Sequence, residues 1–175
     1  MTELAREPET GTGRRRSDLS RRLVAEALGT DLLIIAVIGS GIMASRLSPD
    51  DVGLQLLENA AATAGALIGL ILMFGAVSGA HFNPVVTLVD RATTRSPANV
   101  VAFAVGVWIG GAYWFTSSTS FANPAVTIAR TLSDTFAGIA PSSAPMFIAM
   151  QLVGAAVAYA LIQFLFQPAH DQPPT

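Results

Sequence analysis

Four long apolar stretches, separated by short polar intervals, constrain the fold of this 175-residue chain more than any other feature. They cover residues 23–44, 59–78, 98–115 and 145–166. At about 1.5 Å of rise per residue, a helix of about 20 residues crosses the hydrocarbon core of a bilayer. Only 13% of the residues are charged, against about 25% in a soluble domain. The sequence therefore predicts an all-α membrane protein with four transmembrane helices.

Glycines recur along these stretches. The pairs Gly65–Gly69 and Gly106–Gly110 have the GxxxG spacing that lets two helix backbones approach closely in lipid. Glycine is also simply frequent in membrane helices. With either interpretation, we expect helices that pack against each other.

Polar tails are expected at both ends. Residues 1–22 have no hydrophobic periodicity, so we expect a disordered tail. A cleaved signal is the alternative, because Ser20-Arg21-Arg22-Leu23 loosely resembles a twin-arginine motif. The apolar stretch that follows is longer than the roughly 7–15 residues of a signal peptide, which favours a membrane helix.

The arginines predict the orientation in the membrane. The cluster within residues 14–22 flanks the first stretch, and the positive-inside rule places it in the cytoplasm. Arg91 and Arg95 follow the second stretch, where the chain has returned to the same side. We therefore expect a multi-pass protein of the cell membrane, surrounded by lipid bilayer. Both termini, including the C-terminal tail 167–175, are expected in the cytoplasm.

Composition excludes several classes of function. The chain has no cysteine, which excludes disulfide scaffolds and thiol chemistry. Five of its ten basic residues lie in one short N-terminal run, so we expect no nucleic-acid partner. We find no Ser/His/Asp set, no cluster of metal ligands and no phosphate-binding glycine loop. We expect no enzyme activity, no cofactor and no bound metal.

Two similar motifs lie between the apolar stretches. Asn83-Pro84-Val85-Val86-Thr87 and Asn123-Pro124-Ala125-Val126-Thr127 match in register and form an internal repeat. Each has an Asn suited to cap a helix and a Pro at the first helical position. We expect short half-helices at about 83–92 and 123–136, too short to span the membrane.

The predicted topology starts the two half-helices from opposite membrane faces. Their N-termini would then meet near the midplane, where inverted repeats with broken helices place a binding site. Unpaired N–H groups and positive dipole ends would converge there. This arrangement predicts a narrow polar constriction for neutral solutes rather than cations.

These motifs, with Ser78-Gly79-Ala80-His81-Phe82 before the first, closely resemble those of the aquaporin, or major intrinsic protein, family. The resemblance covers about residues 21–166, and the second motif is similar to a bacterial branch associated with glycerol and metalloid solutes. It implies that Asn83 and Asn123 donate hydrogen bonds to solutes in single file. It also implies a tetramer, and a supporting role for Glu26 and His81 at the loops. The implied pore constriction comprises Asn83, Pro84, Val85, Asn123, Pro124 and Ala125.

The implied selectivity filter departs from the family pattern. By the family's offsets it falls on Thr63, Gly111, Ser120 and Val126. The family usually has an arginine at the position of Val126, and Arg130, one turn further on, is no automatic substitute. We expect a wide filter without an aromatic side chain or a fixed cation. Such a filter favours glycerol or neutral metalloid hydroxides over water alone.

The spacing of the two motifs is a larger departure. The asparagines lie 40 positions apart, whereas the family places two further helices between them. The third and fourth helices of the family therefore have no counterpart. Their loss removes part of the wall of the pore. Either an oligomer supplies the missing part, or the protein does not conduct.

Four further residues have a predicted role. Asp31, inside the first stretch, is a candidate proton relay or a carboxylate that faces a cavity or another subunit. His81 is either a titrating gate or a loop residue. Tyr113 and Trp114 are expected to anchor the chain at the membrane interface.

Three functions remain open at this point. The first is a passive channel for water, glycerol or arsenite-like hydroxides. The second is a non-conducting remnant or a structural subunit of a membrane oligomer. The third is a proton-coupled transporter that uses Asp31 and Glu26.

Overall fold

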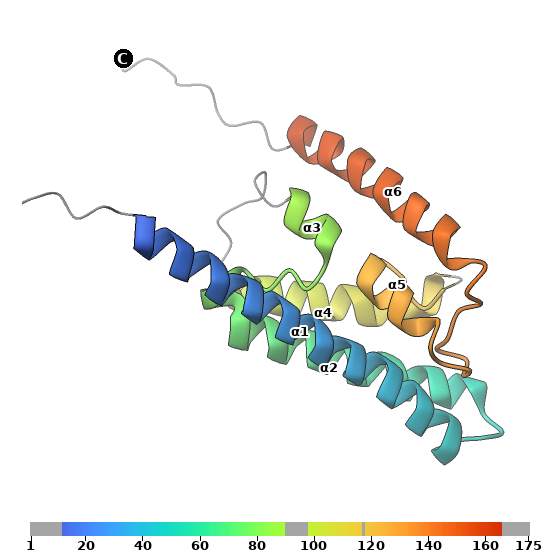
Figure 1. Ribbon diagram of the computed structural model, residues 1–175. Coiled ribbons are helices and arrows are strands. Elements are labelled where there is room, and N and C mark those ends of the chain that lie inside the picture. The colour runs from blue at the N-terminus through green and yellow to red at the C-terminus, as the bar shows by residue number, and fades with distance from the viewer. Residues whose placement is uncertain (1–11, 90–97, 117, 166–175) are drawn as a thin grey trace, which may run out of the picture.

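Helices account for all regular secondary structure in the part of the chain that the structure describes. The structure is a computed structural model that describes residues 12–89, 98–116 and 118–165. Figure 1 shows the helices α1 (Thr12–Leu47), α2 (Val52–Ser78), α3 (Pro84–Val89), α4 (Ala98–Phe115), α5 (Pro124–Arg130) and α6 (Ala144–Leu165). The predicted all-α class is therefore confirmed. The predictions for residues 1–11, for the end of the half-helix at 90–92, for Arg91 and Arg95, and for the C-terminal tail lie outside the described residues.

Three of the helices are long and apolar enough to cross a membrane. They are Leu19–Leu47 within α1, the whole of α2 and the whole of α6. The apolar helix Asn99–Phe115 within α4 is shorter. The apolar character of an all-α membrane protein is confirmed, and four complete crossings stay a prediction.

Three helices differ from their predicted bounds, and one of them is α2, which begins at Val52 rather than at residue 59. α1 begins at Thr12, so residues 12–22 are helical where we expected disorder. A membrane-length helix extends easily, because each added residue gains one backbone hydrogen bond without a new nucleation step. α5 ends at Arg130, and Thr131 caps it through its backbone N–H. Residues 131–136, predicted as helix, are not helical.

Only one of the two predicted glycine pairs lies in a helix interface. A Cβ at Gly106 would lie 2.5 Å from Ile68 of α2, and one at Gly110 would lie 3.1 Å from Ala64. A Cβ at Gly65 or Gly69 would meet nothing within 4 Å. Gly106 and Gly110 therefore let α4 lie close along α2.

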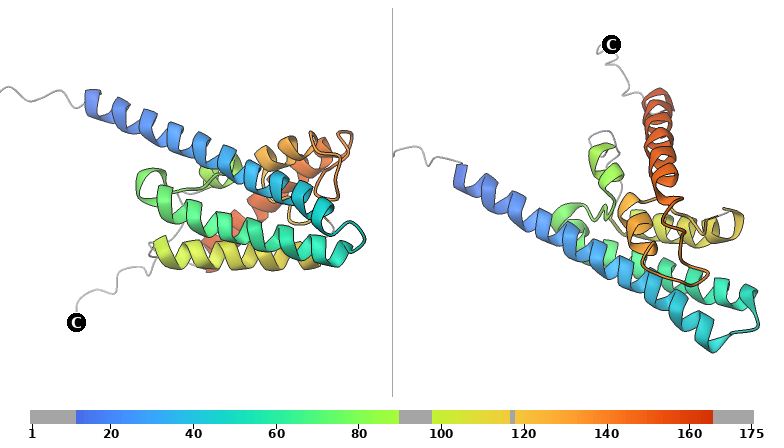
Figure 2. Two further views of the ribbon diagram at one scale, coloured as in Figure 1. Left: turned by 90° about the horizontal axis from the view of Figure 1, so that it is seen from below. Right: turned by 45° about the vertical axis from the view of Figure 1, so that its right-hand side comes forward.

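α6 lies apart from the α1–α2–α4 group (Figure 2). The helices that it contacts in the described part of the chain are the short α3 and α5. None of the residues in its most apolar 18-residue window is buried. A helix this apolar needs lipid or another protein surface around it.

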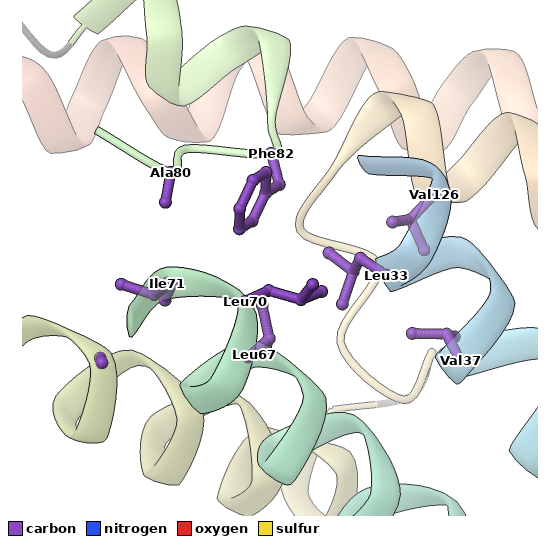
Figure 3. Close-up of a cluster of buried hydrophobic side chains, with 9 residues drawn as sticks. Leu33, Val37, Leu67, Leu70, Ile71, Ala80, Phe82 and Val126 are labelled. Carbon is purple, nitrogen blue, oxygen red and sulfur yellow. The ribbon is translucent and has the colours of Figure 1, made fainter. Parts of the chain in front are cut away.

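The buried core joins α5 and the loop before α3 to the long helices. Leu33 and Val37 of α1, Leu67 and Leu70 of α2, and Phe82, which precedes α3, belong to one buried cluster (Figure 3). Ile71, Ala80, Ala102 and Val126 complete this cluster. Burial of these side chains fixes the loop before α3 against α1 and α2.

Candidate functional site

The two Asn-Pro motifs meet at their tips. Asn83 donates from Nδ2 to the carbonyl oxygen of Ala122 at 2.8 Å. Asn123 donates from Nδ2 to the carbonyl oxygen of Phe82 at 2.6 Å. Each amide thus binds the residue immediately before the other asparagine. Two segments 40 positions apart in the sequence are brought together by this reciprocal pair of hydrogen bonds.

The same side chains cap the helices that follow them. Asn83 Oδ1 accepts the N–H of Val85, and Asn123 Oδ1 accepts the N–H of Ala125, both at 3.0 Å. Because each amide oxygen is bound to its own helix, each NH₂ group must face the other motif. An amide nitrogen carries two protons, so each asparagine keeps a second donor after its cross-contact.

Each short helix has a threonine at the equivalent position of the repeat, four residues after its asparagine. Thr87 Oγ1 donates to the carbonyl of Asn83, and Thr127 Oγ1 donates to the carbonyl of Asn123, both at 3.0 Å. The repeat that the sequence shows is therefore a repeat of local structure as well.

The loops that precede the two motifs hold a strained backbone. Ala80 and Ser120, each three residues before its asparagine, have φ values of 54° and 62°. Phe82 and Thr119 have φ values of 48° and 49°. A left-handed conformation costs a non-glycine residue about 1–3 kcal/mol and persists only where surrounding contacts maintain it.

Glu26 of α1 supplies such contacts to the first loop. Its carboxylate accepts the backbone N–H groups of His81 at 3.1 Å and of Phe82 at 2.8 Å. Hydrogen bonds to a charged acceptor are stronger than neutral ones. Glu26 therefore holds the loop in the position that presents the Phe82 carbonyl to Asn123.

Gln151 of α6 supplies similar contacts to the second loop, and our sequence analysis missed it. Its Nε2 donates to the carbonyl of Phe121 and, at 2.8 Å, to Thr127 Oγ1. The signal was a glutamine near the start of the apolar stretch 145–166, whose second glutamine, Gln163, lies near the end of the stretch. Polar residues inside membrane segments usually face protein, so Gln151 marks the side of α6 that contacts the loop.

A cavity of about 290 Å³ lies beside the two asparagines. Asn83, Asn123 and His81 contribute to its wall, together with apolar side chains from α1, α2 and α4. Its described lining residues are Leu33, Val37, Thr63, Leu67, Ile71, Gly79, Ala80, His81, Asn83, Val86, Val101, Val105, Ile109, Tyr113, Ser120, Ala122, Asn123, Val126 and Arg130. The first half-helix residues that line the cavity are Val86 in α3 and Val126 in α5. The lining does not include the residues before them in each helix, which are Pro84, Val85, Pro124 and Ala125.

Three of the four residues predicted for the filter line this cavity. Thr63, Ser120 and Val126 do so, whereas Gly111 is exposed and lies outside the lining. Instead of Gly111, Tyr113 of α4 lines the cavity, and only 2% of its surface is exposed. Tyr113 lies one turn beyond Gly110, on the face that packs against α2, which explains why it points inward. The expectation that Tyr113 is an interfacial anchor is wrong, whereas Trp114 is 56% exposed.

A buried hydrogen-bond network crosses the cavity wall at Tyr113. Its hydroxyl lies 2.9 Å from Thr63 Oγ1 and accepts a hydrogen bond from Arg130 Nη2 at 2.9 Å. Arg130 Nη1 donates to Thr119 Oγ1 at 2.6 Å. The guanidinium also lies over the ring of Phe121, 4.4 Å from its centroid. The expected wall of small residues without a cation is therefore corrected: an aromatic hydroxyl and an arginine are present.

Asp31 lies away from this site. Its side chain is exposed and lies outside the cavity lining. The helical periodicity explains the difference, because Leu33 and Val37 occupy the face of α1 that points inward.

Comparison with known proteins agrees with this geometry. A model of the family described as major intrinsic protein matches residues 14–112 and 89–174. The chain is 39% identical to aquaglyceroporin AqpS of Rhizobium meliloti (strain 1021) over 217 residues, covering 87% of the chain and 93% of the relative. It is 37% identical to aquaporin NIP6-1 of Arabidopsis thaliana over 109 residues, covering 62% of the chain and 33% of that relative.

The match to the rhizobial relative also shows how many positions of that relative have no counterpart in this chain. The match runs over 217 residues, but 87% of this 175-residue chain is only about 152 residues, so about 65 positions of the relative have no counterpart within the match. Two helices of about 20 residues with their loops need about that length. From the two family matches, the long match to the rhizobial relative and the paired Asn-Pro motifs, we conclude that this chain belongs to the major intrinsic protein family, as a shortened member.

Proposed function

We propose that this chain is a passive transmembrane channel for small neutral solutes, with glycerol-sized polyols as its main substrates. The observation that carries the proposal is the reciprocal contact of Asn83 and Asn123 with the backbone of the opposite motif. It leaves amide donors from both motifs on the wall of one cavity. A solute hydroxyl can then exchange hydrogen bonds with water for hydrogen bonds with these amides.

The chemistry of the cavity favours uncharged, partly apolar solutes. Val37, Leu67 and Val105 form apolar wall, whereas Asn83, Asn123 and Tyr113 provide polar groups. A polyol matches this arrangement, because its carbon atoms can contact the apolar wall while its hydroxyl groups bind the polar groups. Described lining residues include no carboxylate, so a cation would lose its hydration without a compensating partner. Neutral metalloid hydroxides have the same hydroxyl chemistry and are the second solute class.

We infer the arrangement in the membrane from the helices and the arginine pattern. α1, α2, α4 and α6 cross the bilayer, with both termini in the cytoplasm. α3 and α5 enter from opposite faces and meet at the midplane. The hydrogen bonds between their tips support this arrangement, because two stubs on one face could not approach each other N-terminus to N-terminus along the membrane normal.

The direct test is glycerol flux into proteoliposomes, measured by stopped-flow light scattering. Asn123→Asp keeps the oxygen that caps α5 but replaces the amide donor, so the contact with the Phe82 carbonyl becomes repulsive. We expect the unsubstituted chain to conduct glycerol and this variant to lose at least tenfold, since 1.4 kcal/mol corresponds to a factor of about ten. Asp134→Asn, the reverse exchange between the same two side-chain types at an exposed position outside the cavity, is the control. Absence of glycerol flux in the folded, unsubstituted protein would refute the proposal.

A second candidate function is that of a non-conducting subunit in a membrane oligomer. The bare surface of α6 and the absent 65 or so positions favour it, because both leave part of the expected wall open. A second copy of the chain, in a tetramer like those implied by the family resemblance, would supply that wall.

The two candidates give different results when the missing wall is restored. Insertion of the relative's helix pair between residues 95 and 100 should create flux if the native chain is a non-conducting subunit. If the native chain already conducts, the insertion should leave glycerol flux within about twofold.

A further inference from the structure

Arg130 is a buried charge that has no charged partner in the part of the chain that the structure describes. Only 1% of its surface is exposed, and its hydrogen-bond partners are the neutral hydroxyls of Tyr113 and Thr119. Its Nε has no hydrogen-bond partner among the described residues. An unpaired charge inside a protein is costly, and inside a membrane protein it indicates a functional position.

The position of this charge is on the wall of the candidate solute path. Arg130 lines the cavity together with Asn123 and Val126. It is the only residue with a permanent charge among the described residues of that lining. The face of Phe121 and the hydroxyl of Tyr113 hold the guanidinium in place, so the charge keeps a fixed distance from a passing solute.

We propose that Arg130 is the cation barrier of this pore, acting through its buried charge rather than through direct contact with the solute. This inference rests on the proposed channel function and adds the group that determines ion exclusion. Because the cavity wall is mostly apolar, the field of the guanidinium is weakly screened there. A neutral polyol crosses this field at little cost, whereas a cation is repelled. Arg130 also positions the Tyr113 hydroxyl toward Thr63.

The test compares the removal of the charge with its retention. Arg130→Gln removes the charge and keeps a polar side chain, whereas Arg130→Lys keeps the charge and loses the two-pronged hydrogen bonding. Glycerol flux and potassium leak are measured on the same proteoliposomes, together with a thermal unfolding curve in detergent. We expect Arg130→Gln to raise the ratio of potassium to glycerol permeability at least tenfold, which is the order expected for a unit charge a few ångströms from the path. Arg130→Lys should keep the ratio of the unsubstituted protein.

A purely structural role of Arg130 gives a different pattern. Both variants would then lose stability and glycerol flux together, without a change in ion selectivity that follows the charge. Equal potassium exclusion in Arg130→Gln and Arg130→Lys, or a potassium leak through the unsubstituted protein, overturns the proposal. Failure of the unsubstituted protein to conduct glycerol is a distinct result, which refutes the channel function and this inference with it.

A second pair of variants leaves Arg130 itself in place in case Arg130→Gln does not fold. Val126 lies one helical turn before Arg130 and lines the same cavity. Val126→Glu puts a carboxylate beside the guanidinium, and Val126→Gln is its uncharged match. We expect potassium leak in Val126→Glu at neutral pH and none in Val126→Gln. The same potassium exclusion in both variants contradicts the proposal.

Discussion

Gly29 of α1 lies against the ring of Phe82, and an added methyl group has no room there. A Cβ at this position would lie 1.9, 2.4 and 2.6 Å from three ring carbons of Phe82, whereas carbon atoms in contact are about 3.5–4.0 Å apart. In Gly29→Ala the ring must therefore move by roughly 1.5 Å. The ring is 1% exposed and packs edge-on against Phe74 at 6.0 Å, so no free space receives it.

The expected cost follows from this overlap. Overpacking a core costs about 1–3 kcal/mol, and the backbone of Phe82 adds a functional cost. Its N–H is bound by Glu26 and its carbonyl is bound by Asn123. A displaced ring moves both groups. We therefore expect Gly29→Ala to lower the free energy of unfolding by about 1–3 kcal/mol and to reduce glycerol flux.

The assay is thermal unfolding in detergent, followed by glycerol swelling of proteoliposomes. Gly39→Ala is the matched control in the same helix, because a Cβ there meets nothing within 4 Å. The double variant Gly29→Ala/Phe82→Ala removes the ring that the methyl group strikes. Its loss of stability should be smaller than the sum of the two single losses. If Gly29→Ala is as stable and as conductive as Gly39→Ala, the packing argument for the first loop is wrong.

Three further substitutions separate the supporting residues from the exposed ones. Glu26→Ala leaves two backbone N–H groups without an acceptor, at about 1–3 kcal/mol each, so its unfolding temperature and its glycerol flux should both fall; normal flux would contradict the supporting role. Gln151→Leu should lower the free energy of unfolding by about 1–3 kcal/mol, because it removes the hydrogen bonds of Gln151 to the second loop. In the same denaturation experiment, Gln163→Leu, an exposed exchange on the same helix, should change the free energy of unfolding little. Asp31→Asn, outside the cavity, should leave glycerol flux and its pH dependence unchanged; a shifted pH profile would favour a proton-coupled transporter.

The start and the cap of each short helix could be predicted from the sequence because short-range chemistry specifies them. Asn followed by Pro determines where each short helix begins and which atom caps it. The register of the repeat then indicates an equivalent role for Asn83 and Asn123. The structure adds the actual partners, the carbonyls of Ala122 and Phe82.

The filter position on α4 could not be taken from family offsets. Those offsets indicate Gly111, but the rotation of α4 is determined by the close contact of Gly106 and Gly110 with α2. Tyr113 shares that face, and Gly111 is turned away by about 100°. The glycine pair was noted in the sequence, and its helical face would have indicated the tyrosine.

The role of Arg130 and the place of α6 depend on long-range packing. Nothing local shows that the guanidinium reaches back to Thr119 and Tyr113. The placement of α6 likewise depends on the contacts of Gln151, which join residues 30 and 24 positions apart. Contacts over such separations follow from the fold and not from local sequence preference.

The most direct test of the central claim is to measure from which side of the membrane each half-helix can be reached. The chain has no cysteine, so a single cysteine can be introduced at Thr87 of α3 or at Leu132 just beyond α5, both exposed. A membrane-impermeant thiol reagent is then applied to intact cells and to inside-out vesicles. We expect Leu132→Cys to react in intact cells and Thr87→Cys to react only in inside-out vesicles. Reaction of both cysteines from the same side would contradict two half-helices that enter from opposite faces and meet at their tips.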